Sequence, residues 1–204
     1  MKTVGITGGV GSGKSLVLDY LREKYNAYII VADKLAHELE EPGEACYERL
    51  VEAFGENILD ETLHIDKIKF AAMIFSDAEA LEKTNAIIHP AVKEEILKRI
   101  RICEESGTEL FVVEAALLIE EGYDKILSEL WYIHAKNSVR RERLKKSRGY
   151  SDEKIDNIMA QQKSEEEFRQ SCRRVIDNSK DTGSTYAQID KIMEELHIGQ
   201  SSGI

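Results

Sequence analysis

Short apolar runs alternate along the chain with stretches in which apolar residues recur every three or four positions. The runs are rich in β-branched and aromatic residues, and several are apolar at every position, which is typical of strands covered on both faces. They predict strands at Lys2–Thr7, Ala27–Val31, Leu110–Glu114, Leu130–His134 and Arg174–Asp177. Strands that alternate with helices predict a parallel sheet in a three-layer α/β/α fold.

Helical spacing is clearest in three groups of residues. These are Leu18, Leu21 and Tyr25; Val92, Ile96 and Ile100; and Tyr186, Ile189, Met193 and Leu196. Between Ala32 and Ser106 only helical patterns occur, with breaks expected at Pro42-Gly43, Gly55 and His89-Pro90. Between Lys136 and Glu167 the pattern is again helical and strongly charged.

The α/β core is therefore expected to be interrupted by two helical segments. We assign residues 1–31, 107–135 and 168–198 to the core. Residues 32–106 form a large helical insertion, 136–167 a short helical lid, and 199–204 a loose tail.

A glycine-rich segment follows the first predicted strand. Gly8-Gly9-Val10-Gly11-Ser12-Gly13-Lys14-Ser15 satisfies the pattern GxxxxGK[ST] of a phosphate-binding loop, or P-loop. Its glycines let successive backbone N–H groups point at phosphate oxygens, and the following helix adds its N-terminal dipole. Lys14 is placed to reach the β- and γ-phosphates, and Ser15 to supply a hydroxyl oxygen to Mg²⁺.

A chance match to this pattern is expected in on the order of 1% of chains of this length. The strand before the loop and the helical spacing after it favour nucleotide binding in a P-loop NTPase fold. We assign ATP binding to the residues Gly9, Val10, Gly11, Ser12, Gly13, Lys14, Ser15 and Leu16.

Composition narrows the class of protein. The 204 residues are 42% hydrophobic and 32% charged, which fits a globular protein and excludes a disordered one. The formal net charge of -10 argues against nucleic acid as a partner, because no global basic field would release counterions from a phosphate backbone.

Neither the cysteines nor the apolar runs indicate export or a membrane. Cys46, Cys103 and Cys172 are far apart and form no CxxC pair, as expected of thiols in a reducing compartment. The first apolar run is too short for a signal peptide, and no run approaches the roughly 20 residues that span a bilayer. We expect a cytoplasmic protein with no membrane partner.

The basic charge is concentrated in one predicted helical segment. Lys136–Arg148 contains seven basic residues and one acid, or about +6 locally. Arg140 and Arg143 share a helix face, and guanidinium groups there would stabilise the charge of a transferring phosphoryl group. A solvated basic helix is the alternative. No Asn/Thr-Lys-x-Asp motif of a GTPase is present, so a small-molecule kinase is favoured.

Two carboxylates follow predicted strands, at the sheet edge where ligands bind in open α/β folds. Asp33 could accept the proton of an acceptor hydroxyl, or it could be the N-cap of a helix over Lys34–Leu39. Glu114 could contact Mg²⁺ through water, or it could cap the next helix. The residues alone leave both pairs of interpretations open.

Taken together, these residues resemble the dephospho-CoA kinase family over about Lys2 to Leu196. The resemblance rests on Gly5–Ser15, Ala32–His37, Glu41-Pro42-Gly43, Ile88–Val92, Leu117–Glu120, Gln162 and Val175–Asn178. It implies Mg²⁺-assisted transfer of the ATP γ-phosphate to the ribose 3′-hydroxyl of dephospho-CoA. Nucleoside or nucleoside-monophosphate kinases are the next alternative, and a nucleotide-switched binding module is a third.

The resemblance also implies roles for individual residues. Asp33 would be the base, and Arg140 and Arg143 cations of the lid or transition state. Asn178 would lie near the adenine of ATP, and His89 on the acceptor side, although a His before Pro can simply end a helix. No oligomeric state follows from the sequence, and a monomer is favoured.

The sequence departs from the family pattern at four positions. Val31 stands where many members have an Asp, so only Asp33 is left as the base, and Ala116 replaces a Pro. Arg173 replaces a common Asp. Ser147 stands where a second lid Arg is common, and Arg148 follows it, which leaves the role of Arg148 open.

Overall fold

The computed structural model describes residues 1–199. The chain forms two compact units: one consists of Met1–Ile29 and the chain from Cys103 onward, the other of Ile30–Ile102. Gly199 is described, and the rest of the predicted tail, residues 200–204, lies outside the described residues.

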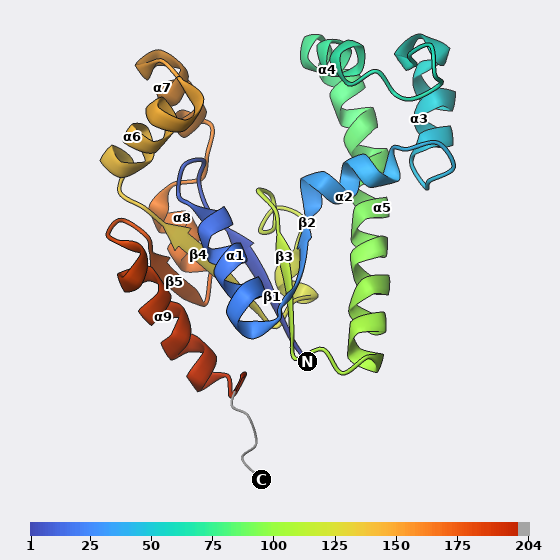
Figure 1. Ribbon diagram of the computed structural model, residues 1–204. Coiled ribbons are helices and arrows are strands. Elements are labelled where there is room, and N and C mark those ends of the chain that lie inside the picture. The colour runs from blue at the N-terminus through green and yellow to red at the C-terminus, as the bar shows by residue number, and fades with distance from the viewer. Residues whose placement is uncertain (200–204) are drawn as a thin grey trace. The chain divides into compact units, whose positions relative to one another are not determined.

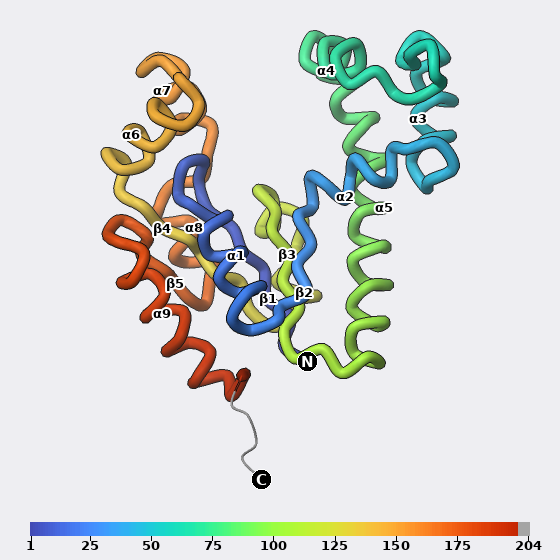
Figure 2. The backbone as a smooth tube through the Cα atoms, in the orientation of Figure 1, coloured from blue at the N-terminus to red at the C-terminus, as the bar shows by residue number. Residues whose placement is uncertain are grey.

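Five strands form a single sheet in the order β2-β3-β1-β4-β5. Their bounds are β1 Lys2–Thr7, β2 Tyr28–Val31, β3 Leu110–Glu114, β4 Glu129–His134 and β5 Arg174–Asp177. The pairs β1/β3, β1/β4 and β4/β5 are parallel, so β1 lies between strands that follow it by more than 100 residues (Figure 2). The predicted parallel sheet is confirmed, with two strands differing by one residue at their first position.

Helices cover both faces of this sheet, as the three-layer prediction requires (Figure 1). Helices α1 (Lys14–Tyr25) and α9 (Thr182–Glu195) lie side by side on one face, where Leu21, Ile189 and Met193 are fully buried. Helix α8 (Glu165–Ser171) covers the other face. Its Phe168 stacks on Tyr132 of β4 with ring centroids 4.6 Å apart. Continuous burial on both faces explains why the strands are apolar at successive positions.

The second unit is helical. It contains α2 (Ala32–Leu39), α3 (Tyr47–Phe54), the 3₁₀ turn η1 (Glu56–Ile58), α4 (Lys67–Ser76) and most of α5 (Ala78–Glu105). Asp66 caps α4 by accepting from the N–H groups of Ile68 and Lys69. The ring of Phe70 in α4 meets that of Phe54 edge-on at 5.5 Å, which ties α4 to α3. Gly55 ends α3 with φ 76°, as its predicted break implies.

The break predicted at His89-Pro90 is wrong, because α5 continues through Pro90. A proline inside a helix removes one hydrogen bond and costs about 3 kcal/mol. Burial offsets this cost on both sides, since Ile87, Val92 and Ile96 are all at most 8% exposed. Apolar packing decides the helix here, and the local preference of proline does not.

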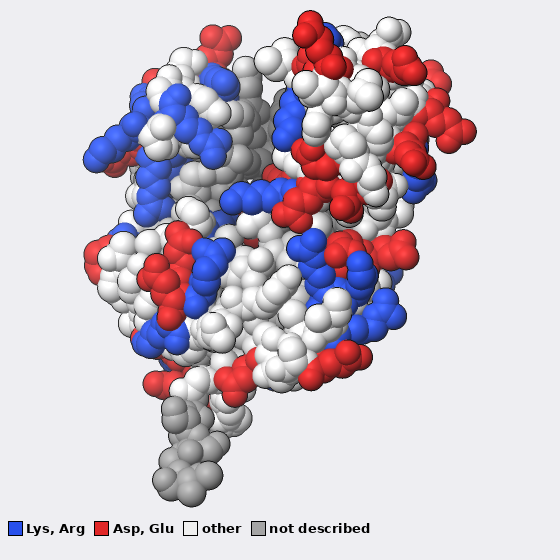
Figure 3. All heavy atoms as spheres, turned by 45° about the vertical axis from the view of Figure 1, so that its right-hand side comes forward, with Lys and Arg blue, Asp and Glu red and all other residues white. Residues whose placement is uncertain are grey.

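Two further helices lie beside the glycine-rich loop within the first unit (Figure 1). Helix α6 (Asn137–Arg148) ends at Gly149 with φ 64°, and α7 (Asp152–Ala160) begins after the N-cap Ser151. Lys and Arg side chains gather over this end of the unit (Figure 3). The described helices include none that is both long and apolar enough to cross a bilayer.

Candidate active site

The loop between β1 and α1 is shaped by glycines in the left-handed region. Gly11 has φ 81° and Gly13, the N-cap of α1, has φ 87°. A Cβ atom at Gly13 would also overlap the side-chain amide of Asn178. Position 13 therefore combines a left-handed backbone with no room for a side chain, and only glycine meets both conditions at low cost.

Lys14 begins α1 and folds back over the loop. Its Nζ donates to the carbonyl oxygen of Gly8 at 2.9 Å and lies 3.4 Å from Oε1 of Glu114. The register of β1 on β3, with Ile6 opposite Glu114, brings this carboxylate to the loop. Both charged side chains are largely buried, at 18% and 14% exposed, so their charges act in a medium that screens them weakly.

Glu114 does not cap a helix. The chain after β3 runs through turns to the short 3₁₀ segment η2 (Tyr123–Lys125), whose N-cap is Gly122. That alternative for Glu114 is therefore wrong. Its carboxylate is instead held at the phosphate-binding loop by the neighbouring strand.

Arg140, on α6, reaches the N-terminal half of the loop Gly8–Gly13. Its Nε donates to the carbonyl oxygen of Val10 at 2.9 Å, and its guanidinium also donates to Oε1 of Gln162. A Cβ at Gly9 would overlap this guanidinium. Burial lowers the pKa of Arg140 below its ordinary value, while Tyr132 acts in the opposite direction. Arginine side chains are not deprotonated in proteins, so the group remains a cation.

Arg143 lies one turn further along the same face of α6 and reaches the C-terminal half of the loop. It donates to the carbonyl oxygen of Ser12 at 3.2 Å and to that of Asn178 at 2.9 Å. The predicted pairing of Arg140 and Arg143 on one helix face thus places two guanidinium groups on the loop. Each of the two donates to a backbone carbonyl of the loop, Arg140 to that of Val10 and Arg143 to that of Ser12.

Asn178 follows β5 and lies against the loop. It is 1% exposed. Its Nδ2 donates to the carbonyl oxygen of Ser12 at 2.8 Å, and its Oδ1 accepts from the hydroxyl of Thr185 at 2.9 Å. The structure therefore brings Asn178 together with the loop, and both polar atoms of its side chain have partners within the protein.

Oxygen ligands around the loop suit a magnesium–nucleotide complex. Ser15, in the first turn of α1, is exposed, and the Glu114 carboxylate lies beside Lys14. The buried hydroxyls of Thr7 and Ser12 have no hydrogen-bond partner. Among the described residues no three His, Cys, Asp or Glu side chains form a metal cluster. In the usual Mg²⁺ site of P-loop proteins, substrate phosphates and water supply most ligands.

Asp33 and His89 belong to the helical unit. Asp33 is exposed in the first turn of α2, whose N-cap is Val31 without a side-chain hydrogen bond. The N-cap alternative for Asp33 is therefore wrong, because the helix starts at Ala32 rather than Lys34. His89 lies within α5 and is half-buried, so it does not end a helix.

Arg148 lies away from the loop contacts of α6. Its side chain is exposed, and its guanidinium lies 5.8 Å from the centre of the Tyr150 ring. Ser147 donates its hydroxyl to the carbonyl oxygen of Arg143 at 2.7 Å. The basic row that contacts the loop therefore consists of Arg140 and Arg143.

Thr185 is a site residue that sequence reasoning missed. It is fully buried on α9, one turn before Ile189. A hydroxyl on the apolar face of an amphipathic helix signals a buried hydrogen bond, since buried polar groups are almost always paired. The sequence thus contained a signal that Thr185 forms a buried hydrogen bond, but no signal that Asn178 is its partner.

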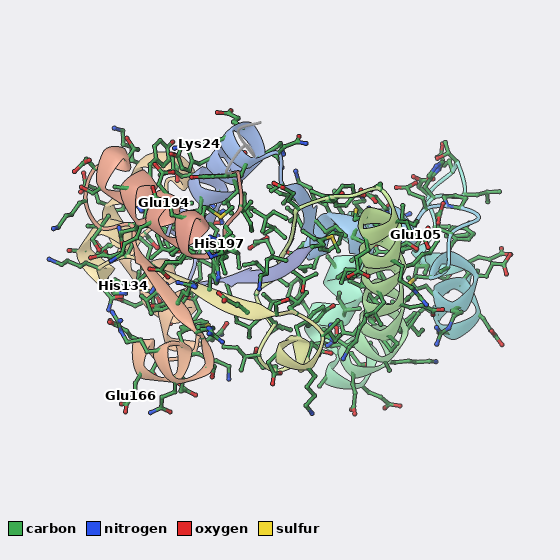
Figure 4. All side chains as sticks on the ribbon, turned by 90° about the horizontal axis from the view of Figure 1, so that it is seen from below. Lys24, Glu105, His134, Glu166, Glu194 and His197 are labelled. Carbon is green, nitrogen blue, oxygen red and sulfur yellow. The ribbon has the colours of Figure 1, made fainter. Side chains whose placement is uncertain are left out.

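A surface pocket lies at the far end of α1. Its lining includes Lys24, Asp190 and Glu194, and Figure 4 labels Lys24 on α1 and Glu194 on the neighbouring α9. Lys24 follows Lys14 by ten residues, or about 15 Å along a helix. Asp190 accepts hydrogen bonds from Tyr20 and Tyr25 at 2.7 Å each and pairs with Lys24 at 2.8 Å. These contacts join α1 to α9 and are separate from the loop.

A parallel sheet with a glycine-rich loop between β1 and α1, and with Lys14-Ser15 at the end of that loop, defines the class of P-loop nucleotide-binding proteins. The family model described as dephospho-CoA kinase matches residues 2–183. The chain belongs to this family.

Relatives agree with this assignment, and a solved structure has the same fold. The dephospho-CoA kinase of Aquifex aeolicus is 40% identical over 196 residues, covering 96% of this chain and 98% of that protein. That of Carboxydothermus hydrogenoformans is 36% identical, covering 94% and 93%. A crystal structure from Thermus thermophilus superposes with a TM-score of 0.76 at 29% identity and covers 96% of this chain and 97% of its own.

Proposed function

We propose that the chain transfers the γ-phosphoryl group of ATP to the ribose 3′-hydroxyl of dephospho-CoA, which completes coenzyme A. Its family membership, carried by a match over residues 2–183, is the observation on which the proposal rests. The loop at Gly8–Gly13, with Lys14 at its end, supplies the phosphate-binding part of the reaction.

Binding of ATP begins at the loop. Backbone N–H groups between Gly9 and Leu16 and the N-terminal dipole of α1 hold the phosphate oxygens. Lys14 then exchanges its contact with the Gly8 carbonyl for the β- and γ-phosphates, at little cost because its charge is already held near the loop.

A magnesium ion bound with ATP would be held by Ser15 and, through water, by Glu114, and it would neutralise charge on the phosphates. The placement of Glu114 beside Lys14 supports this assignment, since the pair keeps an oxygen ligand and a phosphate-binding cation together.

Asp33 is the proposed base. Its carboxylate accepts the proton of the 3′-hydroxyl while the hydroxyl oxygen forms a bond to the γ-phosphorus. The bond from that phosphorus to the β–γ bridging oxygen breaks, and ADP leaves with the electron pair. An exposed carboxylate two residues after the carboxyl end of β2 supports this role.

Arg140 and Arg143 are the proposed cations for the transferring group. As negative charge spreads over the phosphoryl oxygens, guanidinium groups fixed near the loop stabilise it without reorganising. Each can do so with N–H donors that remain beyond its carbonyl contacts, since a guanidinium carries five. We assign Arg140 to the N-terminal half of the loop and Arg143 to its C-terminal half.

Domain roles follow the same proposal. Residues 32–106, with His89, bind the acceptor, and residues 136–167 cover ATP and exclude water that would otherwise hydrolyse it. The favoured form is a cytoplasmic monomer.

Acceptor-dependent ADP release tests this function. Purified protein with ATP and Mg²⁺ is expected to release ADP rapidly only when dephospho-CoA is present, and slowly with AMP, CMP or a nucleoside. Release that depends on one of those acceptors and not on dephospho-CoA would contradict the proposal. Tight ATP binding with no transfer to any acceptor would favour a nucleotide-switched binding module.

A further inference from the structure

We infer that Asn178, held by Thr185, is a positioning residue that orients the P-loop backbone toward the phosphates. The inference rests on the proposed ATP-dependent reaction. It replaces the expected contact between Asn178 and adenine with a role behind the loop.

The Asn178 side chain is buried and hydrogen-bonded within the protein. At 1% exposure it offers almost no surface to a ligand. Its amide N–H is bonded to the Ser12 carbonyl, and its amide oxygen accepts from the Thr185 hydroxyl. The second amide N–H is buried with the rest of the side chain, so an adenine contact would require Asn178 to leave this position and break its buried bonds, which costs about 1–3 kcal/mol for each group left unpaired.

Hydrogen bonds also hold the backbone of Asn178. Its backbone N–H donates to the carbonyl oxygen of His134 at 2.8 Å, and its own carbonyl accepts from Arg143 at 2.9 Å. These bonds join it to the end of β4 and to α6, while Thr185 joins it to α9. Asn178 is therefore fixed by three elements before it contacts the loop.

The geometry of the peptide bond between Ser12 and Gly13 relates the direction of the Ser12 carbonyl to that of the Gly13 N–H. The Ser12 carbonyl accepts from both Asn178 and Arg143, so its direction is fixed. In a trans peptide the N–H of the next residue points opposite to the carbonyl, and no described peptide is cis. The N–H of Gly13 is thus directed away from Asn178, as a donor at the start of α1 must be to meet an anion.

Gly13 shows how closely the two parts fit. Any Cβ at this position would overlap the Asn178 amide, and the left-handed φ of 87° is unfavourable for other residues. The close approach lets the amide reach the Ser12 carbonyl at 2.8 Å. The loop conformation and Asn178 therefore depend on each other.

The test separates loop positioning from base recognition. The variants are Asn178→Ala, Asn178→Leu, which is of similar size and uncharged but has no N–H donor, and Thr185→Val. Affinities for ATP, inosine triphosphate and inorganic triphosphate are measured by calorimetry, together with kcat and KM for both nucleotides. Asn57→Ala and Thr182→Val, both at exposed positions, are matched controls.

We expect Asn178→Leu to weaken all three ligands by about 10- to 100-fold, the factor for a lost buried hydrogen bond. The ratio of ATP to inosine triphosphate affinity stays within about twofold, and KM for dephospho-CoA is unchanged. Loss of ATP affinity alone, with inorganic triphosphate unaffected, would overturn the inference in favour of adenine recognition. A purely structural role would lower the melting temperature and leave all three affinities intact.

Two features keep the test decisive. If the Asn178 variants do not fold, Thr185→Ser is expected to restore the triphosphate affinity that Thr185→Val loses, since serine keeps the hydroxyl that valine lacks. Failure of Thr185→Ser to do so would also overturn the inference. The calorimetric measurements need no acceptor, so they remain informative even if dephospho-CoA proves not to be the substrate.

Discussion

The Nε of Arg140 donates to the carbonyl oxygen of Val10 at 2.9 Å, although 130 residues separate them. This bond attaches α6 to the N-terminal half of the phosphate-binding loop. A fixed guanidinium there needs no reorganisation when charge develops on a phosphoryl group, which is the condition for effective electrostatic catalysis.

Arg140→Lys is expected to lower kcat by about 100-fold. This is less than the effect of removing an arginine finger, because the lysine keeps a positive charge at position 140. A lysine cannot bond Val10 and Gln162 together in the geometry of a guanidinium. Steady-state kinetics check this. Arg148→Ala is the control, and we expect it to stay within about threefold because Arg148 is exposed against Tyr150. Equal losses in the two variants would contradict the distinction.

Glu114→Gln is expected to raise the Mg²⁺ concentration needed for half-maximal rate by about 10-fold, as for other groups that act on a metal through a bound water. Excess Mg²⁺ should restore most of the rate. A magnesium titration of kcat measures the effect. Glu109→Gln, an exposed carboxylate before the opposite end of β3, should titrate like the unaltered protein. A rate loss that excess Mg²⁺ does not relieve would show that Glu114 acts only through its ion pair with Lys14.

Asp33→Asn should remove most turnover while ATP binding survives, because the amide cannot accept the hydroxyl proton. We expect kcat to fall by about 10²- to 10⁴-fold, the usual contribution of a general base. Rates and ATP affinity are compared with those of Asp124→Asn, an exposed position in η2. Turnover within a few-fold of the unaltered protein would remove Asp33 from the role of base.

The buried carboxylate of Glu129 predicts a pH dependence of stability. Burial raises its pKa, but hydrogen bonds from Arg174 at 2.7 Å and Trp131 at 3.0 Å outweigh this and hold the pKa below its usual value. A lowered pKa stabilises the fold above the unfolded value near 4.3, and the contribution is lost as pH falls through the folded pKa.

Glu129→Gln should therefore lose about 2 kcal/mol at pH 7, less than a typical broken buried pair because Arg174 keeps Glu195. Thermal unfolding should show a melting temperature about 4–8 °C lower. The difference from the unaltered protein should shrink below pH 4. Exposed Glu166, labelled in Figure 4, provides the control Glu166→Gln with little change at either pH. A constant difference at all pH values would show that packing, not charge, stabilises this position.

Local patterns predicted the parts of the fold that local physics controls. The β-branched run at Lys2–Thr7 and the glycines that follow it specify a strand and a loop without help from distant residues. Pro90 was misinterpreted because burial of Ile87 and Ile96, which the break prediction ignored, keeps its helix intact. The start of α2 one residue before Asp33 changed that residue from a cap to a first-turn carboxylate.

The candidate site was predictable residue by residue but not as a network. Lys14 and Ser15 follow from the spacing of the loop, and the shared face of Arg140 and Arg143 follows from helix geometry. The bond between Asn178 and Ser12 spans 166 residues, and it arises only when β5 is placed beside β4. Such contacts depend on strand order, which the sequence pattern does not encode.

The most direct test of the account identifies the phosphorylated product. The protein is incubated with dephospho-CoA and ATP labelled in the γ-phosphate, and the products are separated and analysed by mass spectrometry and phosphorus NMR. The account predicts label in coenzyme A as a 3′-phosphomonoester, in amounts equal to the ADP released. Label found only in inorganic phosphate, or on another hydroxyl, would contradict it.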